Sequence, residues 1–180
     1  MKKLFSSLFI FFLTISSSFA QTSFFGGLNV AGSTNVGFWG LNPTAEVEQK
    51  IFGNLNADFR LNGFVDLGPN ENIPGVNTKD YHRSIYSDLG LNFKLIDRKV
   101  DWSIGAGGSY RIGTEKFVDE VGYNGNTLVH YDTRKINFSG FGIFVKNTIG
   151  FGKNVSLNLT VYRFNFWGEY MSVGPSFKIN

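Results

Sequence analysis

A strict two-residue alternation of apolar and polar side chains is the feature that most constrains this sequence. In residues 55–67, one face carries Leu, Ala, Phe, Leu, Gly, Val and Leu, and the other carries Asn, Asp, Arg, Asn, Phe and Asp. Residues 100–112 repeat the pattern, with Val, Trp, Ile, Ala, Gly, Tyr and Ile opposite Asp, Ser, Gly, Gly, Ser and Arg. A strand sorts such residues onto two surfaces, whereas a helix scatters them around its circumference. Both segments are therefore predicted to be β-strands.

The same period predicts eight strands in the chain. They cover residues 24–31, 44–52, 55–67, 81–95, 100–112, 131–149, 155–161 and 170–179. The phase of the alternation changes near Ser139-Gly140, which predicts a β-bulge there. Connections at Gly53-Asn54, 96–99 and 150–153 are short, whereas those at 32–43, 68–80 and 113–130 are long. Short turns at one end and long loops at the other are typical of a barrel with two different ends.

Residues 1–20 have the features of a cleaved export signal. A basic start precedes an apolar run at residues 4–15, which is shorter than the roughly 20 residues that a membrane-spanning helix needs. Small residues at Ser18 and Ala20 predict cleavage after Ala20. The mature barrel domain is then expected to comprise residues 21–180.

Alternation alone does not tell which face points outward. A soluble barrel keeps its apolar side chains inside, and a membrane barrel turns them toward lipid. Charged residues make up 17 % of the chain, against about 25 % in an average soluble domain. The apolar faces are also long enough to cross an apolar band of roughly 25 Å. The sequence therefore predicts an all-β fold, an eight-stranded antiparallel up-and-down transmembrane β-barrel.

The polar faces mix acids and bases, as expected for paired charges that fill a narrow interior. The cations expected to point inward are Lys50, Arg60, Lys94 and Arg111, and the anions are Glu46, Glu48, Asp58, Asp88 and Asp101. Aromatic residues near the strand ends predict belts at the two membrane interfaces. The residues concerned are Tyr81, Trp102, Tyr110, Phe164, Trp167 and Tyr170.

The chain resembles the small eight-stranded outer-membrane barrels of diderm bacteria over residues 21–180. The resemblance rests on the leader, the eight strands, the rhythm of turns and loops, and the last strand. That strand contributes the alternating residues Met171, Val173, Phe177 and Ile179. Pro175 interrupts its alternation, and Asn180 stands where the family usually ends in an aromatic residue. The resemblance implies an outer-membrane location and contact with lipid, with lipopolysaccharide and with the barrel assembly machinery.

Two alternatives rest on short motifs. His82 and Ser84 share a strand face and loosely resemble the His-x-Ser element of outer-membrane lipid A deacylases. A histidine base beside a serine nucleophile needs a third group to orient it, and no residue is identified for that role. Gly37-Phe38-Trp39 is similar to the Gly-x-Trp start of lipocalins, which would make the protein a secreted soluble barrel for a small apolar ligand. The simpler interpretation is a polar strand rim and an aromatic loop.

The expected role is therefore structural or at the cell surface, without enzyme activity. The long connections 68–80 and 113–130 are the candidate contacts for an extracellular partner, because loops on a rigid scaffold commonly carry recognition. The chain has no cysteine and two histidines, which excludes thiolate zinc sites and cysteine nucleophiles and argues against a histidine-rich metal site. No catalytic, cofactor-binding or metal-ligating residue is assigned, and no cofactor is expected. It has no run of Lys or Arg that could follow a phosphate backbone, which argues against nucleic acid as a partner.

Overall fold

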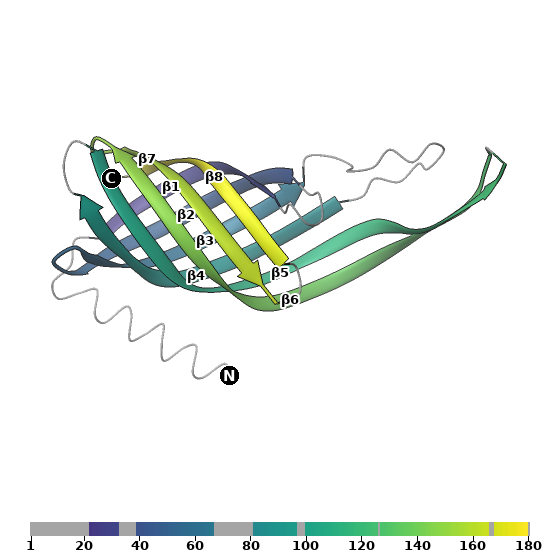
Figure 1. Ribbon diagram of the computed structural model, residues 1–180, viewed down its shortest axis with the longest axis horizontal. Coiled ribbons are helices and arrows are strands. Elements are labelled where there is room, and N and C mark those ends of the chain that lie inside the picture. Colours follow the sequence, from purple (N-terminus) through teal and green to yellow (C-terminus); the bar gives the residue numbers. More distant parts are fainter. Residues whose placement is uncertain are drawn as a thin grey trace.

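Eight antiparallel strands form a closed barrel in the order β1 to β8 (Figure 1). The computed structural model describes residues 22–32, 39–66, 81–96, 100–125, 127–165 and 168–179. The strands are β1 Thr22–Gly32, β2 Trp39–Phe52, β3 Leu55–Asp66, β4 Tyr81–Ile96, β5 Val100–Asn124, β6 Thr127–Phe151, β7 Val155–Phe164 and β8 Gly168–Ile179. Each strand pairs with its neighbours in sequence, and β1 pairs with β8 to close the barrel. The predicted fold class is confirmed.

The barrel has two unlike ends. At one end, which we call the turn end, Gly53-Asn54 joins β2 to β3 and residues 152–154 join β6 to β7. Gly53 has a φ of 52°, a conformation that tight hairpin turns require and that glycine adopts without strain. At the other end, β5 and β6 run far beyond the barrel as a two-stranded ribbon (Figure 1).

This ribbon corrects the prediction of a loop at residues 113–130. Strands β5 and β6 are each 25 residues long, and they pair from Val100↔Phe151 to Asn124↔Thr127. Gly125, with a φ of 61°, lies in the turn. The segment is therefore a protruding β-hairpin, because its backbone groups find their partners across the ribbon. The predicted loop 32–43 was also too long, since β2 begins at Trp39, and loop 68–80 lies outside the described residues.

The predicted bulge at Ser139-Gly140 was wrong. Ser139 pairs with Ile112 and Gly140 pairs with Arg111 in one unbroken register. The register shifts instead between Val118 and Glu120 and between Gly122 and Tyr123, in the protruding part of β5. The sequence pattern changes phase near residue 139 although the register does not. The reason is that Phe138 of β6 points into the aromatic interior, while the polar Ser139 faces outward.

The side-chain distribution is the inverse of that in a soluble barrel. On β3, the outward Phe59, Leu61 and Val65 are 44 %, 50 % and 47 % exposed, whereas the inward Asp58 and Arg60 are each 2 % exposed. The same division holds around the barrel, where Val, Leu, Ile and Phe side chains cover the outside. A soluble lipocalin-like barrel would need an apolar interior, so this alternative does not fit. No helix in the described part of the chain is long and apolar enough to cross a bilayer.

Candidate functional site

The interior of the barrel is filled by layers of paired polar side chains and aromatic rings. Nearest the turn end, Lys146 of β6 forms ion pairs with Glu46 of β2 and Asp58 of β3. Its ammonium group donates to Asp58 Oδ2 over 2.9 Å and also donates to Glu46. All three side chains are buried, and a buried charge is tolerated when it is paired in this way. The sequence analysis missed Lys146, because the assumed phase change in this strand left its face unassigned.

The next layer is centred on Asp88 of β4. Arg60 forms an ion pair with it at 3.0 Å. Asn62, Ser109 and Tyr162 donate hydrogen bonds to its two oxygens over 2.9, 2.6 and 2.8 Å. Donors from β3, β5 and β7 therefore hold Asp88. Such charge-assisted hydrogen bonds offset the cost of burying a carboxylate.

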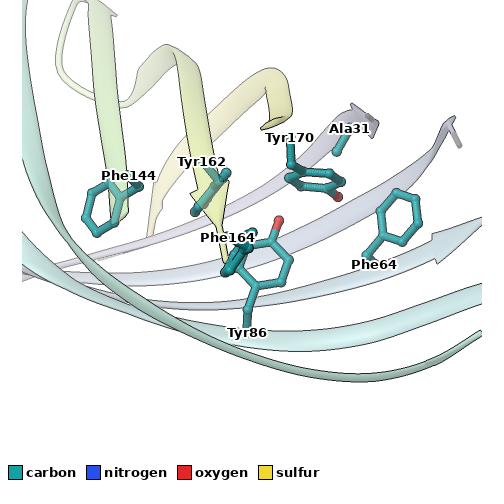
Figure 2. Packing of buried hydrophobic residues seen from close by; sticks show 7 residues of the cluster. All are labelled: Ala31, Phe64, Tyr86, Phe144, Tyr162, Phe164 and Tyr170. Atoms are coloured by element: carbon teal, nitrogen blue, oxygen red, sulfur yellow. The ribbon is translucent and has the colours of Figure 1, made fainter. Parts of the chain in front are cut away.

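Aromatic rings close the interior above Asp88. The cluster of buried residues shown in Figure 2 consists of Ala31, Phe64, Tyr86, Phe144, Tyr162, Phe164 and Tyr170. The guanidinium of Arg111 lies among rings of this cluster and Phe138, at 4.7 Å from the centroid of Tyr170 and 5.4 Å from that of Phe164. A cation surrounded by ring faces gains electrostatic attraction that partly replaces its hydration.

Of the residues predicted to form aromatic belts, two face outward and two face inward. Trp102 and Tyr110 lie on the outer face, where Tyr110 packs on Phe141 with ring centroids 4.7 Å apart. Phe164 and Tyr170 were assigned wrongly, because both are buried inside the barrel. Position near a strand end does not distinguish an interfacial ring from an interior one.

His82 and Ser84 both point into the interior, and both bind Arg111. The Ser84 hydroxyl accepts from Arg111 Nε over 2.9 Å, and His82 Nε2 lies 2.9 Å from Arg111 Nη2. Their exposed fractions are 3 % for His82 and 5 % for Ser84. The hydroxyl of Ser84 is therefore engaged by a cation rather than by a base, and neither group can meet a lipid on the outer wall. Together they orient Arg111 within its aromatic surroundings.

The interior is hollowed toward the turn end. Two adjoining polar cavities of about 130 and 160 Å³ lie there and share Ser23, Glu48 and Lys94. Of the predicted inward charges, Lys50, Lys94, Glu48 and Asp101 line these cavities. Among the described residues, no group of three or more acidic or histidine side chains could hold a metal ion.

The second candidate site is the protruding hairpin of β5 and β6. β4 pairs with β5 only as far as Lys116, and β7 pairs with β6 only from Gly142. Beyond those points, β5 and β6 pair with each other alone within the described residues. Each then has one strand edge whose N–H and C=O groups are open to a further strand.

Solved structures with the same architecture are small surface barrels. Neisserial surface protein A (NspA) has a TM-score of 0.52 at 12 % identity, covering 90 % of this chain and 99 % of that one. The fold of this chain is that of the small eight-stranded outer-membrane barrels. A major outer membrane protein of Thermus thermophilus has a TM-score of 0.51 at 12 % identity, covering 88 % and 99 %.

The Yersinia pestis outer membrane protein Ail, solved in a phospholipid bilayer nanodisc, has a TM-score of 0.50 at 8 % identity, covering 89 % and 100 %. At these identities the likeness concerns the fold. No family model and no curated protein sequence matches the chain.

Proposed function

We propose that this protein is an integral outer-membrane barrel whose role is exercised at the cell surface by the β5–β6 hairpin. The observation that carries the proposal is the unequal length of the strands. A membrane-spanning strand needs about 9–11 residues, and β7 and β8 have 10 and 12. Strands β5 and β6 have 25 each, so more than half of the hairpin is not needed to cross a bilayer.

The outward side chains of β5 change from apolar to polar at the level where, in this proposal, the hairpin leaves the membrane. From Val100 to Ile112, the outer face of β5 is apolar apart from Gly108, and the next outward residue is Thr114. At ~3.3 Å per residue and a tilt of about 45°, that stretch rises roughly 28 Å, close to the ~25 Å of an outer-membrane apolar band. The Thr114 hydroxyl donates to Asn137 over 2.9 Å just above it.

The filled interior supports a role other than transport or catalysis. The layers around Lys146, Asp88 and Arg111 fill the barrel with buried, paired side chains, which argues against an open pore. His82 and Ser84 both contact Arg111 inside the barrel, which argues against their use as a lipid hydrolase pair. The proposed role is therefore contact, either with an extracellular partner or with neighbouring envelope components.

Export and assembly are part of the proposal. Residues 1–20 lie outside the described residues and keep their interpretation as a cleaved leader. Strand β8, with outward Met171, Val173, Phe177 and Ile179, would present the alternating segment that the barrel assembly machinery recognises. The outer wall would contact phospholipid in the inner leaflet and lipopolysaccharide in the outer one.

The hairpin can be shortened without disturbing the barrel. Lys116 and Lys135 are directly paired, so replacing residues 117–134 by Asn-Gly closes the ribbon with a favoured two-residue turn. Cells that carry this variant are expected to lose adhesion to plates coated with protein or with anionic polysaccharide. The β4–β5 ladder, which ends at Lys116, stays intact, so the barrel should still form.

A length-preserving variant provides the control. Tyr123→Ser removes an exposed ring near the tip and keeps both strand edges. If the edges carry recognition, this variant adheres as well as the unmodified protein. Unchanged adhesion of the shortened variant, together with unchanged uptake of a dye that the envelope normally excludes, would overturn the surface role.

A further inference from the structure

The described residues that line the barrel opening at the turn end carry more positive than negative charge. Four lysines line its two cavities, namely Lys50, Lys94, Lys153 and Lys178, which we call the lysine ring. Lys146, deeper inside, is already paired with Glu46 and Asp58. Apart from Glu46, the acidic residues that line the cavities are Glu48 and Asp101. Among the described lining residues, lysines therefore outnumber carboxylates.

The lysine ring is distributed around the whole opening. Lys50 lies on β2, Lys94 on β4, Lys153 in the turn between β6 and β7, and Lys178 on β8. In the closed order β1 to β8, the strands β4 and β8 are opposite each other. Cations therefore face the cavity from opposite sides as well as from the sides between them.

The described acidic side chains form no ion pair with the ring. Glu48 instead accepts a hydrogen bond from Asn92 over 2.7 Å. Lys94 and Lys178 are half-buried, so part of their hydration is lost without a compensating carboxylate.

Neutral donors complete the lining. Hydroxyl and amide groups of Ser23, Ser103, Asn154, Ser156 and Ser176 border the cavity of about 130 Å³. Charge-assisted hydrogen bonds from ammonium groups to oxyanions are roughly twice as strong as neutral ones, and lysine is a common phosphate ligand. Low-dielectric walls also focus the field of like charges into a cleft.

We propose that the turn end of the barrel is a binding site for a phosphate-class oxyanion, held by the lysine ring. The inner cavity, which Lys94, Lys153 and Lys178 line and whose volume is about 130 Å³, has room for a small oxyanion with some of its water. The ligand is a free phosphate or the phosphodiester of a lipid headgroup. This site is independent of the hairpin, from which it is separated by the Arg111 and Asp88 layers.

The test is a titration of the folded protein in uncharged detergent micelles, followed by phosphorus NMR and calorimetry. The probes are inorganic phosphate, pyrophosphate and glycerophosphoglycerol, which is the deacylated headgroup of phosphatidylglycerol. Saturable binding of any of these probes, weakened by added sodium chloride, is expected. Binding of the phosphodiester alone identifies a lipid headgroup as the source, and binding of inorganic phosphate identifies a free anion.

The double variant Lys94→Gln/Lys178→Gln removes cations from opposite sides of the opening and is expected to bind at least tenfold more weakly. Lys116→Gln/Lys135→Gln removes the same charge from the hairpin and should bind within twofold of the unmodified protein. Retention of the boiling-dependent gel shift shows that each variant is folded. No binding of any probe at millimolar concentration, or equal binding by both double variants, would overturn the proposal.

Discussion

Lys146 shows how one residue decides whether the charged interior is stable. Its ammonium group lies between two carboxylates from different strands, Glu46 and Asp58. A buried ion pair adds little to stability compared with an apolar replacement of the whole group, but removal of one partner leaves an uncompensated charge. The stability of the barrel interior between β2, β3 and β6 therefore depends on this single cation.

Lys146→Met is expected to destabilise the barrel by about 3–5 kcal/mol, because Glu46 and Asp58 would remain buried beside each other without a cation. The measurement is the urea midpoint of unfolding in micelles, followed by the loss of the fast-migrating form on gels. Lys153→Met is the matched control, since Lys153 is exposed in a turn and should change stability by less than about 1 kcal/mol. Equal midpoints for the two variants would contradict the central role of Lys146.

At the scale of elements, inward-facing glycines let the strands pack closely against the interior rings. Gly90 of β4 faces inward, and the ring of Phe144 from β6 reaches it past Gly107 of the intervening strand β5. A Cβ at residue 90 would lie 2.7 Å from Phe144 Cζ and 2.5 Å from the carbonyl oxygen of Ala106. The absence of a side chain at Gly90 thus makes room both for a ring and for the neighbouring strand.

Gly90→Ala is expected to cost about 1–3 kcal/mol through overpacking, measured as a lower urea midpoint. Gly108→Ala is the control on the adjacent strand β5, because a Cβ at residue 108 would meet nothing within 4 Å. Alanine also has a lower backbone entropy than glycine in the unfolded chain, so Gly108→Ala should be neutral or slightly stabilising. A loss of stability at Gly108 equal to that at Gly90 would show that the packing argument is mistaken.

The sequence predicts those elements whose side-chain period is regular. The two faces of β3 follow from the period, and the Gly53-Asn54 turn follows from its residue types. The interior positions of Arg60 and Asp88 follow once the low charge content has turned the apolar face outward. The hairpin does not follow from it, because two register shifts, at Val118/Glu120 and Gly122/Tyr123, disturb the alternation in β5. The pairing of Lys146 with residues about 90–100 positions earlier requires the barrel to be closed, which no local pattern encodes.

At the scale of the whole molecule, closure of β1 against β8 makes the eight strands one cooperative unit. Their ladder runs from Phe24↔Ile179 to Gly32↔Met171, with a gap between Gly27↔Ser176 and Val30↔Val173. Pro175 lies beside this gap, and its backbone has no N–H to donate. The interruption that Pro175 makes in the sequence pattern thus coincides with an interruption in the closing ladder.

The closed barrel predicts a mobility shift on SDS gels. Without boiling, the wall should stay folded, because every strand within it has a paired neighbour on both sides, and the compact form should migrate faster than the boiled chain. Extraction of the protein from the envelope should require detergent, because apolar side chains cover the outside. The variant with residues 117–134 replaced should shift in the same way, since the removed ribbon lies outside the barrel. A single position before and after boiling, with release of the protein into the soluble periplasmic fraction, would mean that the apolar wall does not face lipid.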